Sequence, residues 1–101
     1  MTTAELAVSL IRAAARHSGA SPRLIISKDR STPTVEARWA CWLVMRDHGL
    51  TVAEIGSAFS RDHTSVCHGL ERSKHHQGKR EESFRDLCDF VKNHHQTKTH
   101  Q

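Results

Sequence analysis

Apolar residues recur three or four positions apart over most of the chain, and short polar segments separate these stretches. The first stretch predicts a helix over about residues 3–17, and Thr2 with Glu5 has the pattern of a capping box at its start. Ser21 followed by Pro22 has the pattern of an N-cap and a first-turn proline, which predicts a second, shorter helical turn. The N-terminal quarter of the chain is therefore expected to be helical.

A polar loop and a strongly apolar helix are expected next. Residues 27–34 contain no apolar side chain except a proline, so this segment is expected to be a loop. The spacing then predicts a helix over about residues 35–46, with Val35, Trp39 and Trp42 on one stripe. Because both tryptophans of the chain lie there, this helix is expected to be the centre of the core, with both rings as core residues.

Two short helices joined by a tight turn are predicted after residue 50. Thr51 and Glu54 form a second capping box for a helix over about 51–59, and the next helix runs over about 62–75. The small side chain of Ala53 is expected to allow close contact between them. The residues expected to face inward are Ile55, Ala58, Phe59, Val66, Gly69 and Leu70. Two helices in this relation form a helix-turn-helix.

A last helix is predicted over about residues 83–93, and the polar residues after it are expected to be a frayed tail. No segment alternates between apolar and polar residues as a strand does. The chain is therefore expected to be all-α, a bundle of five or six helices. The expected domain covers residues 1–95, with a disordered tail over 96–101.

Charge and composition narrow the class of protein. The net charge of +4 and the pI near 9.3 are consistent with a polyanionic partner. No apolar run approaches the roughly 18 residues of a membrane-spanning helix, and the N-terminus has no basic leader segment. A cytoplasmic protein is therefore expected. The three cysteines form no CxxC pair and are expected to be reduced thiols.

Residues 61–68, RDHTSVCH, are the most unusual stretch of the sequence, because they place charged, hydroxyl and imidazole groups within eight positions. A metal site is one hypothesis. His63 and His68 lie five positions apart, however, roughly 140° around a helix, and cannot hold one ion together. The adjacent pairs at 75–76 and 94–95 point to different faces and are expected to be solvated histidines near helix ends.

Catalysis is a second hypothesis for this stretch. Cys67 could lie beside His63 on one helix, but no oxyanion donor is evident, and Asp62 is better explained as part of the helix-turn-helix. We therefore expect no enzyme activity, no cofactor and no metal.

The third hypothesis is that the stretch reads DNA. The first turn of the second helix in a helix-turn-helix enters the major groove. The groove-facing side chains would be Arg61, Asp62, His63, Thr64, Ser65 and His68. Arginine suits guanine, aspartate can accept from a cytosine amine, and a threonine methyl can contact a thymine methyl.

A family resemblance supports this reading. The segment LTVAEIGSAFSRDHTSVCHG, residues 50–69, closely resembles the signature of the C-terminal DNA-binding domain of the bacterial replication initiator DnaA, typically SLPEIG-AFG-RDHTTVLHA. LIISKDRS, residues 24–31, resembles the LLSKRRS loop of that family. The resemblance extends over about residues 4–92. It implies a Trp-repressor-like helical fold, the fold of domain IV of DnaA, and sequence-specific binding to double-stranded DNA.

The resemblance also implies roles for individual residues. The base contacts carried over are Arg61, Asp62, His63, Thr64 and Ser65. Arg30 corresponds to an arginine placed in the minor groove, and the expected contacts to the DNA backbone are Lys28, Arg38, Thr51 and His68. Asp29, Thr32 and Glu71 stand where the family has basic residues, so fewer phosphate contacts are expected. A dimer, an extra domain or a DNA-bending partner would then support binding.

No GxxxxGK[ST] nucleotide-binding loop occurs in the sequence, so no nucleotide partner is expected. The expected function is transcription regulation by a stand-alone DnaA-like domain, from a phage or a phage-derived element, and the expected location is the nucleoid. One alternative is a replication-control protein that binds initiator-type boxes beside a replication partner. The other is a docking module that has lost DNA binding. RNA binding is disfavoured because the RNA major groove is too narrow for a helix.

Overall fold

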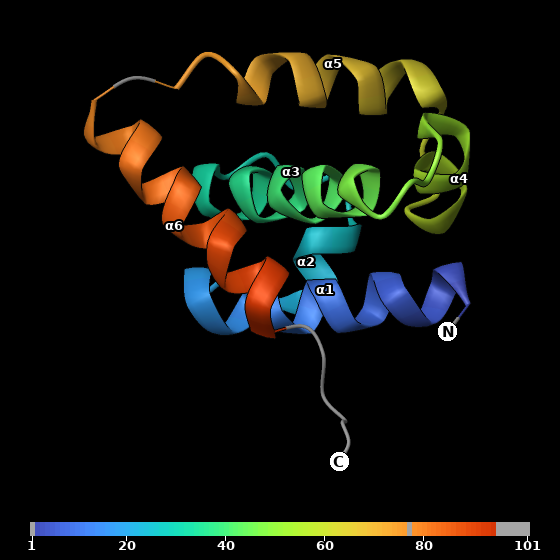
Figure 1. The fold of residues 1–101 in the computed structure, drawn as a ribbon, viewed down its shortest axis with the longest axis horizontal. Coiled ribbons are helices and arrows are strands. Elements are labelled where there is room, and N and C mark those ends of the chain that lie inside the picture. Colours follow the sequence, from blue (N-terminus) through green and yellow to red (C-terminus); the bar gives the residue numbers. More distant parts are fainter. Residues whose placement is uncertain (1, 77, 95–101) are drawn as a thin grey trace.

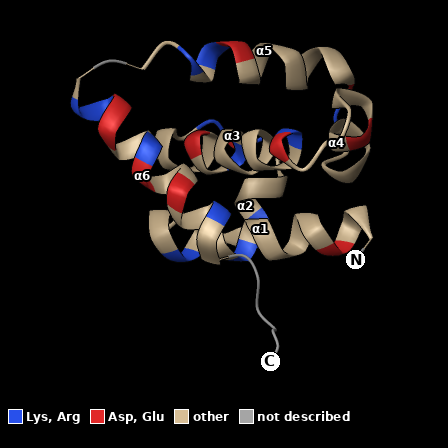
Figure 2. Cartoon of the chain, viewed as in Figure 1, with Lys and Arg blue, Asp and Glu red and all other residues tan. Residues whose placement is uncertain are grey.

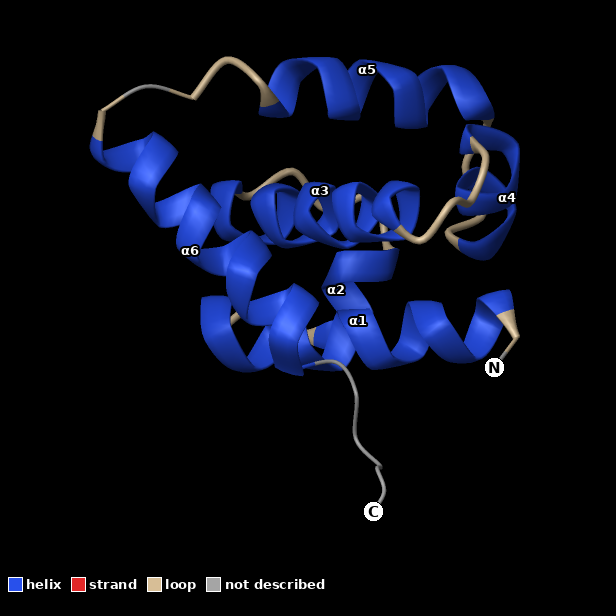
Figure 3. Cartoon of the chain, viewed as in Figure 1, coloured by secondary structure: helices blue, strands red, loops and turns tan. Residues whose placement is uncertain are grey.

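The computed structural model describes residues 2–76 and 78–94, and it confirms the all-α prediction for these residues (Figures 1 and 3). The helices are α1 (Thr3–Ser18), α2 (Pro22–Ile26), α3 (Thr32–Asp47), α4 (Val52–Ala58), α5 (His63–Ser73) and α6 (Lys79–His94). The tail predicted over 96–101 lies outside the described residues. No helix in the described ranges combines the length and the apolar character needed to cross a membrane.

Local capping signals predicted several helix starts correctly. The Thr2 side chain accepts from the Glu5 amide at 3.0 Å, and the Glu5 carboxylate accepts from the Thr2 amide at 2.8 Å. Thr51 and Glu54 form the same reciprocal pair at the start of α4. These pairs satisfy amides that a helix start otherwise leaves without partners.

Two helices begin earlier than the sequence pattern predicted. α3 begins at Thr32, inside the expected loop, because Ser31 takes the N-cap position and Pro33 fits the first turn. α6 begins at Lys79, not near residue 83. The charged KREE residues there are good helix formers, and Arg85 bonds Glu81 one turn away at 3.1 Å.

The core forms where α1 and α6 pack on α3, which lies between α1 and α5 in Figure 1. Trp42 is 2% exposed and confirms its predicted place in this core. Trp39 packs against the core but is only partly buried, so it lies at the edge of the core and not at its centre. The three cysteines are free thiols, as predicted.

The closest contact within the helix-turn-helix lies at Gly56, not at Ala53, which is exposed. A Cβ at Gly56 would lie 2.4 Å from the carbonyl oxygen of Arg61. The Arg61 amide also donates to the Gly56 carbonyl at 2.8 Å. Gly56 therefore lets the turn fold back onto α4, and the Ala53 prediction was wrong because it considered helix faces without the turn.

His76 was expected to be solvated, but its side chain is buried. Its ring stacks on Phe84 with 4.5 Å between ring centroids and lies edge-on to Trp39 at 5.9 Å. Its Nε2 lies 2.9 Å from a carboxylate oxygen of Glu36, which also bonds Arg80. His76 thus ties the segment after α5 to both α3 and α6, whereas His75 is exposed as predicted.

Candidate nucleic-acid interface

α5 buries one face against α3 and α4 and leaves the other exposed (Figure 1). Val66 and Gly69 lie on its buried face. Gly69 is required there, because a Cβ would lie 2.5 Å from the Trp42 ring and 2.7 Å from the Trp39 nitrogen. The exposed residues of α5 are His63, Thr64, Cys67, His68, Glu71 and Arg72. Like the recognition helix of a helix-turn-helix, α5 thus packs on the core with one face and exposes the other to solvent.

Asp62 starts α5 as its N-cap. Its Oδ1 accepts from the Ser65 amide at 2.8 Å, and this bond from the Ser65 backbone holds the pKa of the Asp62 carboxyl below its usual value. The capping bond fixes a charged carboxylate at the exposed start of the helix. His63 and Thr64 follow it in the first turn, and Ser65 is half-buried toward α3.

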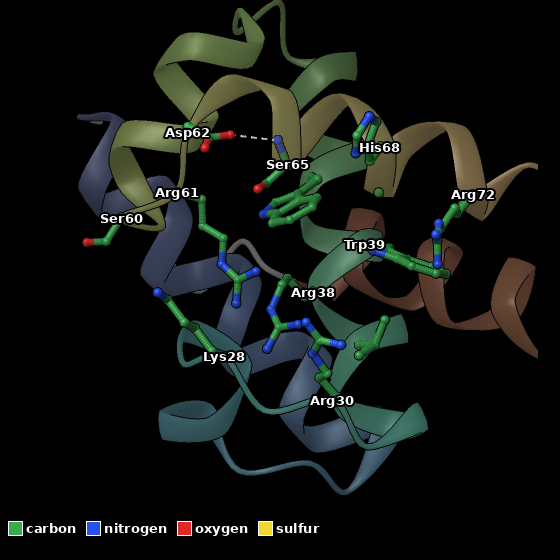
Figure 4. Close-up of a pocket in the computed structure, with 13 residues that line it drawn as sticks. Lys28, Arg30, Arg38, Trp39, Ser60, Arg61, Asp62, Ser65, His68 and Arg72 are labelled. Carbon is green, nitrogen blue, oxygen red and sulfur yellow. Dashed lines mark hydrogen bonds between the residues drawn. The ribbon is translucent and has the colours of Figure 1, made fainter.

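A groove of about 790 Å³ separates this end of α5 from the loop that precedes α3 (Figure 4). Among the described residues that line it, five are cationic and one is acidic, namely Lys28, Arg30, Arg38, Arg61 and Arg72 against Asp62. In Figure 4 the side chains of Arg30, Arg38 and Arg61 come together in the middle of the groove. Such a surplus of positive charge favours an anion.

The charge elsewhere is more balanced. α6 carries acidic and basic side chains along the same helix (Figure 2). Ion pairs join Arg85 to Glu81 on this helix and Arg80 to the mostly buried Glu36 of α3. The groove beside α5 is therefore the more strongly cationic of these two surfaces.

Arg38 was expected to contact the DNA backbone, but its guanidinium bonds the protein's own backbone. The side chain is 3% exposed and donates to the carbonyls of Leu24, Ile25, Ser27 and Asp29 at 2.7 to 3.2 Å. Burial, and then the nearby Arg61 charge, lower its pKa to about 10. Its geometry fits a support for the loop better than a phosphate contact.

We expect Arg38→Met to lower the free energy of unfolding by roughly 1.5–3 kcal/mol, because it removes bonds from a charged donor to buried carbonyls. Arg46→Met is the control, since Arg46 is exposed at the end of the same helix and makes one such bond, to Leu50. Urea denaturation measures both. An Arg38→Met variant with unchanged stability and weaker DNA binding would show instead that Arg38 contacts a phosphate.

Arg61 also bonds the loop. Its Nη2 donates to the Ser27 carbonyl, and its guanidinium carbon lies 6.0 Å from the centre of the Trp42 ring. Partial burial lowers its pKa. In this structure the side chain therefore rests across the groove from α5 to the loop and does not extend away from the protein.

The charged residues of the loop itself are Lys28, Asp29 and Arg30. Lys28 and Arg30 are exposed and line the groove. Asp29 accepts from the Ser31 amide at 3.1 Å and from the Ser31 hydroxyl, and these bonds lower its pKa. Asp29, which replaces a basic residue of the family pattern, thus shapes the loop.

Of the two other residues expected to contact the DNA backbone, His68 lines the groove and Thr51 caps α4. The Thr51 hydroxyl is occupied by the capping box of α4, whereas His68 is exposed on α5 and lines the groove. Sequence reasoning missed Arg72, which also lines it. Arg72 lies four residues after His68 and seven after Ser65, so helical spacing alone could have placed it on their face.

The turn between α4 and α5, with α5 exposed beside a cationic groove, defines a helix-turn-helix protein. A family model described as the bacterial dnaA protein helix-turn-helix matches residues 8–72. The chain therefore belongs to this family, as its sequence resemblance predicted. A comparison with curated proteins gives no match. Membership of the family supports DNA binding.

Proposed function

We propose that this protein binds duplex DNA sequence-specifically, with the first turn of α5 in the major groove. The observation that carries the proposal is the exposure of that turn at the rim of a groove with five cationic side chains and one acidic side chain. The proposed base contacts are Arg61, Asp62, His63, Thr64 and Ser65. Their donors and acceptors suit the base edges of the major groove.

The phosphate contacts would flank this turn. Lys28 lines the groove from the loop, and Arg72 lines it from α5. His68, one turn before Arg72 on α5, lines the groove as well. Arg30 on the same loop would enter the adjacent minor groove. Thr51 would contribute through its place at the exposed start of α4. These contacts would set the register of α5 on the duplex without reading sequence.

The finer role we propose is transcription regulation, in a phage or a phage-derived element. Replication control at initiator-type boxes would use the same residues. The two roles differ in where the preferred site lies, not in how α5 reads it.

A selection from random duplexes, followed by binding to the recovered site at several salt concentrations, tests the proposal. A recovered motif found upstream of particular genes supports regulation of transcription. A motif that resembles the initiator's A/T-rich nonamer with a CACA end supports replication control instead. Weak, salt-sensitive binding without any enriched sequence would contradict sequence-specific recognition and favour the docking module.

Lys28→Ala is expected to weaken binding to every duplex by a similar factor, because a lysine on phosphate carries no sequence information. The slope of log affinity against log salt should fall in magnitude by about one. Lys79→Ala, which removes the same charge from exposed α6, is the control and should leave the slope unchanged. A loss confined to one sequence would mean that Lys28 reads a base.

A further inference from the structure

Trp42 carries the buried polar group that the fold leaves without a partner. Among the described residues, its Nε1 is the one buried side-chain nitrogen or oxygen that has no hydrogen bond. Buried donors in folded proteins are nearly always paired, and an unpaired one destabilises the folded state. The N–H of Trp42 is therefore a donor that an acceptor entering the groove could satisfy.

The surroundings of Trp42 indicate what kind of acceptor fits. Trp42 lines the cationic groove with Arg38, Arg61 and Lys28. The guanidinium of Arg61 lies 6.0 Å from the centre of the indole ring. Guanidinium and ammonium groups are donors without acceptor capacity, so they cannot satisfy the indole N–H. An anion could accept from the indole N–H while the positive charge of the groove offsets its own charge.

We propose that the indole N–H of Trp42 donates to a phosphate oxygen, and that a phosphate of the DNA backbone occupies this part of the groove after Arg61 has moved aside. This inference rests on the proposed function, because it names a contact made by the same interface. It adds a neutral donor beneath the cationic side chains, at a position that neither the sequence motif nor the family match assigns.

The movement of Arg61 leaves no carbonyl unpaired. Arg61 and Arg38 both donate to the Ser27 carbonyl, Arg38 at 2.7 Å. When Arg61 leaves, Ser27 keeps its bond from Arg38, and the loop keeps the other three bonds of that guanidinium.

An anion would also relieve the crowding of charge in the groove. Arg38 and Arg61 are two partly or fully buried cations on one carbonyl, and burial together with this proximity lowers the pKa of Arg38 to about 10. A phosphate that takes the place of Arg61 would offset the charge of the buried Arg38, which keeps its bonds to the protein carbonyls. The freed Arg61 is then available for a base edge, so phosphate entry and base reading become one event.

The test uses the full chain with an atomic substitution at residue 42. Chemical synthesis can place β-(3-benzothienyl)alanine there, which has the bicyclic shape of tryptophan with sulfur in place of N–H. Trp42→Phe is a simpler variant, but it also removes packing from a residue that is 2% exposed. The benzothienyl protein should unfold at the same temperature as the natural protein or at a higher one, since it loses no bond in the free state and no longer buries an unpaired donor.

We expect the benzothienyl protein to bind its selected duplex roughly tenfold to a hundredfold more weakly, the effect of losing a hydrogen bond to a charged group. The loss should be similar on all sequences. The salt slope should stay unchanged, because the indole is neutral. Equal binding by the natural and the benzothienyl proteins would overturn the inference and leave the proposed function standing.

The indole proton reports on the site directly. The chain has two tryptophans, so a proton–nitrogen correlation spectrum holds two indole signals, and Trp39→Phe identifies that of Trp42. Duplex DNA should move the Trp42 signal downfield as the bond forms. Inorganic phosphate and dimethyl phosphate are the small-molecule probes.

Two further outcomes test the inference and the proposed function independently of each other. A shift with inorganic phosphate in a protein that binds no duplex would overturn the proposed function and assign the site to a free phosphate. A shift with neither phosphate nor DNA would overturn the inference, whatever the protein's affinity for DNA.

Discussion

Arg61→Ala is expected to lower affinity for the preferred duplex by about 1–3 kcal/mol, which is roughly fivefold to 150-fold. Arg61 is the member of the proposed reading turn that also bonds the loop, through the Ser27 carbonyl. Its removal would take away the proposed base contact and one connection between the turn before α5 and the loop. Fluorescence anisotropy with the selected duplex, and with duplexes changed one base pair at a time, measures the effect.

Arg12→Ala is the matched control for this variant. Arg12 is an exposed arginine of α1, and α3 lies between α1 and the recognition helix (Figure 1). The Arg12→Ala variant removes the same charge as Arg61→Ala and should change the affinity for DNA little. If Arg61 reads a base, its variant loses discrimination at one position of the site. A uniform loss on every duplex would show instead that Arg61 contacts phosphate or only holds the loop.

Gly56→Ala is expected to lower the free energy of unfolding by about 1–3 kcal/mol, as overpacked sites do. Alanine normally favours a helix over glycine by about 1 kcal/mol, so the sign depends on the clash. The new Cβ would meet the Arg61 carbonyl oxygen at 2.4 Å, and this oxygen belongs to the backbone and cannot rotate away. The melting temperature should fall by roughly 4–8 °C for each kcal/mol.

Ser57→Ala provides the comparison, because Ser57 is the next residue of α4 and is exposed. Alanine should be neutral or slightly stabilising there. DNA binding should fall in the Gly56 variant beyond what partial unfolding explains, since the turn that places Arg61 must shift. A Gly56 variant as stable as the natural protein would mean that the turn accommodates a Cβ and that the approach at Gly56 is not required.

The local features of the fold were predictable because their partners lie close in sequence. A capping box joins residues three apart, so Thr2 with Glu5 and Thr51 with Glu54 were visible in the sequence. The same holds for the helical spacing that defined α1 and the pair α4–α5. The start of α3 was missed because a polar segment that contains a proline fits a loop as well as a first helical turn.

The errors at single residues share a different cause. Arg38 and His76 carry polar groups, and no sequence pattern indicated the partners that bury them. The carbonyls that hold Arg38 lie 9 to 14 residues away, and the Glu36 carboxylate lies 40 residues from His76. A polar residue is predicted to be solvated unless such distant partners are known.

The sequence by itself determined the helical class, the helix-turn-helix and the position of the turn proposed to read DNA, since periodicity, caps and the RDHTS motif are local properties of the chain. Only the tertiary structure decided what surrounds that turn. The packing of α3 against α5 brings the loop, Arg72 and Trp42 to one groove, rests Arg61 on Ser27 and leaves the Trp42 N–H unpaired. These relations depend on segments tens of residues apart, which meet only when the core has formed.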